Sequence, residues 1–349
     1  MNMYKSNRQF IIKRILTAVF TILGMSAQTQ DIHFSQFYES PLSRNPALAG
    51  IFTGNMRIQA IHRDQWTSIE VPFKTSLISF EYKMPVGDYD DYITSGTSGY
   101  KDLAGNNMLT TTNVQQSLTY HKSLDNISNR YLSVGFSGGY TSKKVDPAIL
   151  TFDNQYGSNG FDAALPSGEV FRDINRNNFE LTTGISYNSA VGERGNFFLG
   201  GSVWYLLRDR SNFLRDSSIQ MKKWQFNGGI KTYIATRIIL HLESNIFIQN
   251  ASKELMAGGM ISYVSSGSGQ DQGLGPQLSL GAGAFVRMKD AIIPVIKVGY
   301  RNFSIAFSTD LNTSKLKSLS QGRGGFEVSL SYITGRQSES FEEYRCPKF

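Results

Sequence analysis

The sequence of 349 residues is poor in three things: cysteine, charge and long apolar runs. Its single cysteine excludes an intrachain disulfide, a CxxC redox pair and a zinc site built from cysteines. Charged residues make up 18% of the chain, against about 25% in typical soluble domains, which argues against a helical bundle with a Glu- and Lys-rich surface. After residue 27 no stretch approaches the ~20 apolar residues of a membrane-spanning helix.

Residues that carry chemistry are equally scarce. Four histidines occur, and none stands at metal-ligand spacing with another histidine or an acid. His241 and Glu243 share one face of a predicted strand, which favours a polar pair lining a lumen over an acid–base pair. The acidic run at 88–91 lacks the spacing of an EF-hand and indicates a solvated loop, with weak calcium binding as the alternative. The sequence therefore predicts no catalytic residue, no metal site and no cofactor.

The first 27 residues show the three regions of a secretory signal peptide. Four lysines and arginines stand, without an acid, before the apolar run 15–24, and the small residues Ser26 and Ala27 follow it. We therefore predict export and cleavage near Ala27; an amphipathic first helix is the alternative. Removing residues 1–27 lowers the formal net charge from +7 to +3, so a nucleic-acid partner is not expected.

What the sequence has in abundance is alternation. It contains 33 Gly, 17 Tyr and 23 Phe, and apolar residues recur at every second position, with Ser, Thr, Gly, Gln and Asn between them. Such a period of two is typical of strands with one apolar and one polar face. Thirteen candidate strands follow from this pattern: 56–60, 78–82, 114–120, 132–140, 179–187, 197–205, 224–234, 240–246, 256–264, 278–288, 292–300, 303–311 and 326–332.

The spacing of these segments predicts a membrane barrel. With their flanks they give strands of about 8–12 residues, the length of a tilted strand crossing a bilayer, whereas soluble strands are nearer 5–6. Export, long alternating strands and aromatic residues at strand ends favour a lipid-facing apolar surface. Outer-membrane barrels have an even strand number, so a fourteenth strand is expected, from Ile32–Tyr38 or from part of 89–100. The fold class predicted is all-β: a transmembrane outer-membrane β-barrel of about 14 antiparallel strands.

The remaining segments are assigned around this barrel. Residues 28–50 form a periplasmic or plug segment, 51–335 form the barrel, and 336–349 form a carboxyl-terminal tail. Long connections are expected near 84–112 and 141–178, and these would lie on the outer surface.

These two long connections are rich in aromatic residues, which are common anchors in protein interfaces. We predict that they bind a partner, with packing of each loop on itself as the alternative. The predicted anchors are Tyr89, Tyr92, Tyr100, Phe152, Tyr156 and Phe161.

Particular residues carry a family resemblance. The motifs are Phe34-Ser35-Gln36-Phe37-Tyr38, Asn45-Pro46-Ala47-Leu48-Ala49-Gly50, Arg63-Asp64-Gln65-Trp66, Leu150-Thr151-Phe152-Asp153-Asn154-Gln155-Tyr156, Gly325-Phe326-Glu327-Val328 and the final Cys346-Pro347-Lys348-Phe349. In this order they resemble the PorP/SprF family of outer-membrane proteins of the type IX secretion system. Asn45-Pro46 also has a purely structural interpretation, because Asn before Pro favours a turn that would seat the amino-terminal segment.

The resemblance implies a non-enzymatic accessory barrel in the outer membrane of a Gram-negative bacterium. Its implied partners are outer-membrane lipid, other type IX secretion components and a large secreted surface protein with a C-terminal sorting domain, of the gliding-adhesin class. Two alternatives stay open: a porin or small hydrophobic-ligand transporter, and a secreted soluble β-sandwich adhesin.

Overall fold

A computed structural model describes most of the chain between residues 32 and 334. None of its helices within the described residues has the length and apolar character needed to cross a membrane. The predicted signal peptide 1–27, the tail 336–349 and Tyr89 lie outside the described residues. The described ranges are 32–65, 73–87, 90–105, 108–125, 130–146, 150–157, 160–162, 164–168, 174–192, 194–207, 221–265, 278–314 and 322–334.

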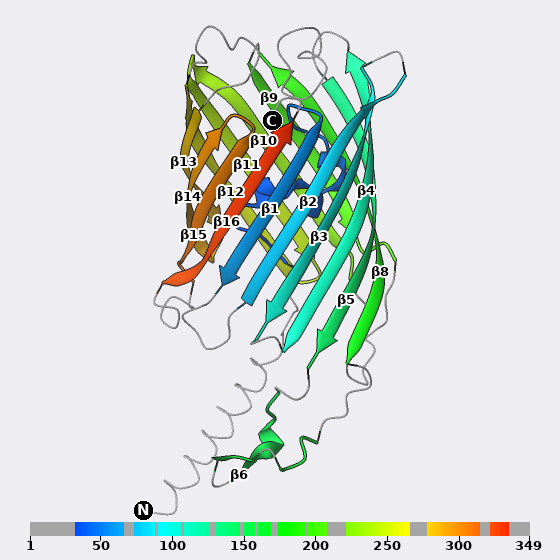
Figure 1. Cartoon of the computed structure of the whole chain (residues 1–349), viewed down its shortest axis with the longest axis vertical. Coiled ribbons are helices and arrows are strands. Elements are labelled where there is room, and N and C mark those ends of the chain that lie inside the picture. The colour runs from blue at the N-terminus through cyan, green and yellow to red at the C-terminus, as the bar shows by residue number, and fades with distance from the viewer. Residues whose placement is uncertain are drawn as a thin grey trace, which may run out of the picture. The chain divides into compact units, whose positions relative to one another are not determined.

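Fourteen antiparallel strands form one closed barrel, as predicted (Figure 1). The first strand pairs with both the second and the last; Ile58, for example, stands opposite Phe80 on one side and Tyr332 on the other. Closure leaves the sheet without an edge, so the backbone groups of the wall pair with one another. The strands are β1 Met56–Gln65, β2 Phe73–Pro85, β3 Tyr92–Ala104, β4 Leu109–Asp125, β5 Arg130–Val145, β8 Asn175–Val191, β9 Gly195–Trp204, β10 Lys223–Ala235, β11 Ile238–Gln249, β12 Ser252–Val264, β13 Leu278–Arg287, β14 Ala291–Tyr300, β15 Phe303–Asn312 and β16 Arg323–Thr334.

Strand β3 is the fourteenth strand, and it corrects one predicted loop. The connection expected at 84–112 is wrong: β3 occupies most of it, and only 86–91 and 105–108 connect strands. The alternation failed to reveal β3 because its outward positions include Ser95, Thr97 and Gly99 rather than large apolar residues. The other candidate, Ile32–Tyr38, forms no strand and lies in the lumen instead.

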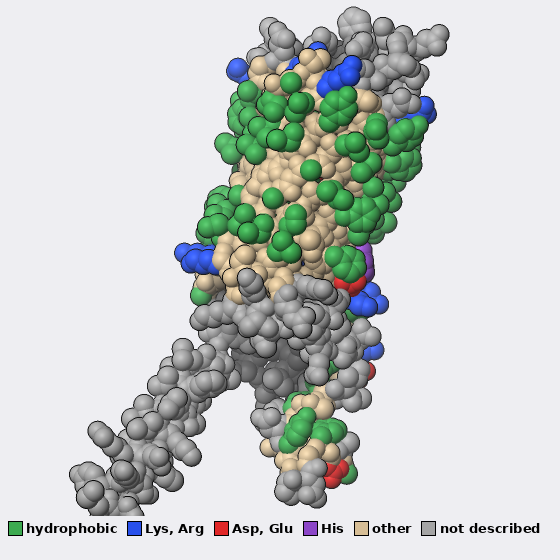
Figure 2. All heavy atoms as spheres, turned by 90° about the vertical axis from the view of Figure 1, so that its left-hand side faces the viewer, with side chains coloured by type: hydrophobic (Ala, Val, Ile, Leu, Met, Phe, Trp, Pro, Cys, Tyr) green, Lys and Arg blue, Asp and Glu red, His purple; other side chains and the backbone are tan. Residues whose placement is uncertain are grey.

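The two faces of the wall follow the expected polarity. Ile78 and Phe80 are exposed on the outside, whereas Ser79 and Glu81 between them are buried. On β13 Leu280 is exposed on the outside, and the preceding serine faces the lumen. Figure 2 shows hydrophobic side chains spread over the outer wall on one side of the barrel. The apolar surface therefore points toward lipid and the polar surface toward the lumen.

The two ends of the barrel differ in their connections. β1 begins and β16 ends at one end, which also carries the short turns 192–194, 236–237 and 301–302. The opposite end carries the long connections 146–174 and 205–222. Because outer-membrane barrels have short turns on the periplasmic side, we name the first the inner end and the second the outer end.

Candidate functional site

Residues 32–55, here named the plug, run through the lumen before the first strand begins (Figure 1). The plug contains three short 3-10 helices, η1 Phe37–Glu39, η2 Pro41–Ser43 and η3 Pro46–Leu48. Proline stands at the start of η2 and η3, where its missing N–H costs nothing. Almost every residue from Phe34 to Phe52 is buried, so the plug forms the core of the barrel.

The first residues of the plug are fixed near the outer end. The backbone N–H groups of Ser35 and Gln36 donate to the two carboxylate oxygens of Glu327, each at 2.8 Å. The Ser35 hydroxyl donates to Asp310 at 2.6 Å. Both acids lie within four residues of the outer ends of their strands. The plug therefore starts in the outer half of the lumen.

Two buried arginines complete this attachment. Arg63 and Arg287 both donate to Asp310, at 2.9 and 3.0 Å, and each arginine side chain is only 3% exposed. Arg287 also donates to the Ser35 hydroxyl at 2.7 Å. A buried charge is tolerated when it is paired and hydrogen-bonded in this way. We name the group the outer latch; it consists of Ser35, Gln36, Arg63, Arg287, Asp310 and Glu327.

Asn45 holds the middle of the plug against the wall. Its side-chain oxygen accepts the N–H of Ala47 at 2.9 Å, which caps η3. Its amide group donates to the carbonyls of Ile185 and Gly201, at 3.2 and 3.3 Å. A Cβ at Gly184 would lie 1.9 Å from the Asn45 oxygen, so the wall needs glycine there. The structural interpretation of the Asn-Pro motif is thus observed directly.

Further polar groups of the plug backbone find partners on the wall. Ser186 donates to the carbonyl of Ala47 at 2.8 Å, and Thr119 donates to the carbonyl of Pro46 at 2.7 Å. A Cβ at Gly135 would lie 2.6 Å from the backbone nitrogen of Ala47. These contacts satisfy a backbone that would otherwise be buried with unpaired groups.

Ion pairs continue through the middle of the lumen. Arg44 of the plug binds Glu243 at 2.8 Å, and His241 lies 2.9 Å from the same carboxylate. The predicted pairing of His241 with Glu243 on one lumen-facing side is therefore confirmed. Glu39 of the plug binds Lys297 on β14.

The last residues of the plug reach the inner end. The N–H of Gly50 donates to Glu81 at 2.8 Å, and Arg57 binds the other oxygen of this carboxylate at 2.7 Å. The Lys83 ammonium donates to the carbonyl of Phe52. The plug therefore crosses the lumen from its outer half to its inner end.

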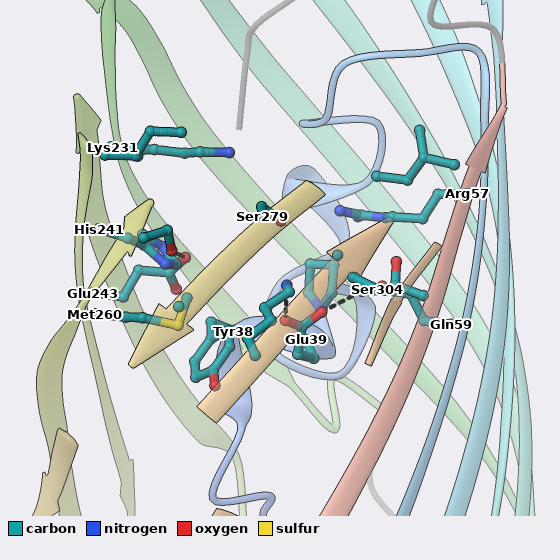
Figure 3. A pocket seen from close by; sticks show the side chains of 18 of the residues that line it. Tyr38, Glu39, Arg57, Gln59, Lys231, His241, Glu243, Met260, Ser279 and Ser304 are labelled. Atoms are coloured by element: carbon teal, nitrogen blue, oxygen red, sulfur yellow. Dashed lines mark hydrogen bonds and ion pairs between the residues drawn. The ribbon is translucent and has the colours of Figure 1, made fainter. Parts of the chain in front are cut away.

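A cavity of about 220 Å³ lies between the plug and the inner end (Figure 3). Figure 3 shows Lys231, His241 and Glu243 on one side of it and Arg57 and Gln59 on the other. Within the described residues, no group of three His, Cys, Asp or Glu side chains is placed to hold a metal ion. The cavity is thus a polar binding space with no metal-ligand cluster.

Two of the predicted partner anchors are not on a loop. Tyr92 and Tyr100 belong to β3 and face the lumen, which corrects their predicted position. Tyr92 is 4% exposed and stacks on His121 with 4.0 Å between ring centroids. Tyr100 packs beside Phe34 of the plug. Both rings pack on the inside of the barrel wall.

Three other predicted anchors lie in the outer connection between β5 and β8. Tyr156 and Phe161 belong to a two-stranded hairpin, β6 Tyr156–Gly157 and β7 Gly160–Phe161. They are 58% and 47% exposed, and their ring centroids are 5.5 Å apart. Phe152 precedes the hairpin and is half-buried. This hairpin is the one exposed aromatic pair that the predicted anchors form within the described residues.

Sequence reasoning missed the outer latch and the pairing of wall residues with Arg44 and Glu39 of the plug. These partners stand up to 292 positions apart, so no local spacing reveals them. The local signals were the Asn-Pro motif in the plug and the spacing of His241 and Glu243 on one strand face.

Comparison with known families decides the assignment. The profile of PorP_SprF, the type IX secretion system membrane protein PorP/SprF, matches residues 26–332. The chain belongs to the PorP/SprF family. A comparison with curated protein sequences finds no match.

Solved outer-membrane barrels are similar in fold to this family member. The toluene transporter TbuX of Ralstonia pickettii is 10% identical over 84% of this chain and 92% of its own, with a TM-score of 0.48. The toluene transporter TodX of Pseudomonas putida is 9% identical over 88% and 95%, with a TM-score of 0.49. A FadL homologue of Pseudomonas aeruginosa is 10% identical over 82% and 92%, with a TM-score of 0.48.

Proposed function

We propose that this barrel is a non-enzymatic docking protein of the type IX secretion system. In this role it binds a large secreted surface protein of the gliding-adhesin class, through that protein's C-terminal sorting domain, and exports or anchors it. The observation that carries the proposal is the plug, which runs through the lumen and is bound to the wall from the outer latch to Glu81 near the inner end. The family assignment supports the secretion role.

The plug opposes a role in solute passage. Opening the lumen would break the hydrogen bonds of Ser35 and Gln36 to the outer latch, the Arg44–Glu243 pair and the Glu39–Lys297 pair together. Leaving one member of a buried ion pair without its partner costs roughly 3–5 kcal/mol. A path for solutes would require several such losses, so contacts outside the lumen are the better candidates for function.

The outer connection between β5 and β8 supplies such contacts. The strand faces are committed to lipid and lumen, and the β6–β7 hairpin exposes two aromatic rings beyond them. Aromatic side chains are the most frequent anchors of protein interfaces. Phe152 and Tyr89 are proposed as further partner anchors beside this pair.

The proposal includes the route to the membrane. A signal peptide over residues 1–27 is cleaved after export, and the mature chain inserts into the outer membrane with the outer end at the cell surface. Other secretion components contact its inner end. No nucleic acid takes part, since the exported chain has a formal net charge of only +3.

Surface proteomics of three strains tests the proposal. Deleting the gene should remove one specific large protein from the surface and leave general secretion unchanged. Deleting residues 152–162 should reproduce that loss with the barrel assembled. A matched control is Val191→Ala, which alters an exposed apolar residue at the inner end of β8 and should change nothing. An unchanged surface proteome together with lost uptake of a small nutrient would favour the porin alternative.

A further inference from the structure

The cavity at the inner end carries more positive than negative charge. Its lining includes five lysines or arginines and two glutamates: Arg44, Arg57, Lys231, Lys297, Arg301, Glu39 and Glu243. Glu81 lies just outside this lining and pairs with Arg57, and the positive excess remains after it is counted. A recess with this excess of positive charge attracts carboxylates.

Polar atoms of three buried residues in the lining have no partner within the described structure. They are the Tyr38 hydroxyl, the Arg44 Nε and the Gln59 Oε1, on residues that are 8%, 4% and 3% exposed. Leaving such atoms unpaired costs roughly 1–3 kcal/mol each. The tyrosine and arginine atoms are donors suited to a carboxylate, whereas the glutamine oxygen accepts an N–H. An acidic peptide offers both kinds of group.

Part of the remaining lining of the cavity is apolar. Leu48, Ile51, Phe198 and Met260 contribute side chains to it. A volume of about 220 Å³ admits one or two side chains rather than a folded segment. The ligand that fits is therefore a peptide that carries an aromatic residue beside its carboxylates.

The chain itself carries such a peptide a few residues after its last strand. The last strand ends at Thr334 at the inner end, and Ile333 lines the cavity. Residues 337–344 contain three glutamates, Phe341 and Tyr344, and no lysine or arginine. At about 3.3–3.6 Å per extended residue, Phe341 lies within ~25 Å of the end of the strand.

We infer that the inner cavity is a receptor site for the acidic, aromatic segment 337–344 of this same chain. The glutamates face the cationic lining, and Phe341 enters the apolar part. Binding would join the carboxyl-terminal tail to the plug, and through the plug to the outer latch. This inference does not rest on the docking of a surface protein, so each can fail without the other.

Disulfide trapping in the purified full-length barrel tests the inference. The native Cys346 is replaced by serine, and Phe341→Cys is combined with Ser279→Cys on the cavity wall. The matched control combines Phe341→Cys with Leu280→Cys, the next residue, which faces lipid. Mild oxidation and a non-reducing gel, with mass spectrometry of the cross-linked peptide, give the rate for each pair.

The cavity pair should form its disulfide at least about tenfold faster than the lipid-facing pair, a difference of roughly 1.4 kcal/mol. Changing Glu342 and Glu343 to glutamine should slow it about threefold or more, because surface charge pairs contribute up to ~1 kcal/mol each. Changing Arg336 and Arg345 to glutamine should leave the rate unchanged or raise it.

Three results would overturn the inference: equal rates for the two pairs, no effect of the glutamate changes, or cross-linking of the cavity cysteine in native membranes to another protein in place of residue 341. If Ser279→Cys prevents assembly, Ser262→Cys on the same cavity wall replaces it. Its control is then Ile261→Cys on the lipid side.

Discussion

The plug is held differently at its two ends. At the outer end Asp310 and Glu327 bind two arginines and the first residues of the plug, and the arginines are almost fully buried. At the inner end the plug leaves a cavity in which buried polar atoms of Tyr38 and Arg44 lack partners within the described residues. The Arg287 Nε of the outer latch also lacks a hydrogen-bond partner among the described residues, so the cavity beside the plug, rather than unpaired atoms, distinguishes the inner end.

The largest expected effect comes from filling the space that the plug needs. Gly135→Val would drive a side chain into the Pro46–Ala47 backbone, which cannot move without breaking its bonds to the wall. Overpacking in a rigid core typically costs about 1–3 kcal/mol, and backbone displacement adds to it. A closed barrel that has not been heated migrates faster on an SDS gel than the boiled protein. We expect this faster band to be lost, or protease to cleave within the plug.

Gly138 on the same strand is the control for this change. A Cβ there meets nothing within 4 Å, and the position is exposed on the outer wall. Gly138→Val should therefore leave the band unchanged. Equal damage from the two valines would mean that the plug does not press on the wall at Gly135.

The next effect tests the outer latch. Asp310→Asn would leave Arg63 and Arg287 short of their shared carboxylate, a loss of roughly 3–5 kcal/mol for a buried pair. Asp290 also binds Arg287, at 2.9 Å, but the Asp290 side chain is 36% exposed. Asp290→Asn should therefore cost less than about 1 kcal/mol. The temperature at which the faster-migrating band disappears measures the stability of each variant. Similar shifts for the two variants would contradict a buried latch.

A smaller effect separates the two faces of the wall. Leu280→Arg places a charge in lipid and should cost about 2–4 kcal/mol near the midplane and less toward the ends, whereas Ser279→Arg faces the polar lumen. Assembly into the outer membrane should fall more for the first variant. Equal losses would mean that β13 does not cross lipid in the assigned orientation.

The smallest effect concerns a loop at the inner end. Burial raises the pKa of Asp91, but hydrogen bonds from Lys122, Tyr120 and the Ser123 N–H outweigh it, so the pKa lies below its ordinary value. A carboxylate whose pKa is lowered in the folded state stabilises that state at pH values above the ordinary pKa. This contribution to stability is lost as the pH falls through the lowered pKa.

Asp91→Asn removes this titration. As the pH falls below the ordinary pKa of aspartate, the transition temperature of the wild-type barrel should fall slightly more than that of the variant, since the unfolded chain takes up a proton before the folded one does. An identical pH dependence of the two proteins would contradict the role of these hydrogen bonds.

The sequence predicted the barrel because lipid demands apolar residues at every second outward position. The alternation did not mark β3, where Thr97 hydrogen-bonds to Gln116 on the outer wall; the even strand number pointed to part of 89–100 as one of two candidates. Sequence reasoning also placed Tyr92 and Tyr100 on a surface loop, because a tyrosine that packs inside a polar lumen has the same neighbours in sequence as one on a loop.

The sequence predicted residues 28–50 as either a periplasmic segment or a plug, without deciding between the two. Its attachment depends on contacts between residues 31 to 292 positions apart, such as Gly50 with Glu81, Asn45 with Ile185 and Ser35 with Glu327. Single polar residues on different strands become a site only after the barrel has closed, and no local pattern records that closure.

Conductance of the purified barrel in planar bilayers tests the central claim most directly. A lumen filled by a bound plug should give no steady ion current in the wild-type protein, and current should appear when the plug is displaced by Gly135→Val in molecules that still assemble. A steady open current through the wild-type barrel, unchanged by that substitution, would contradict the account and favour a porin.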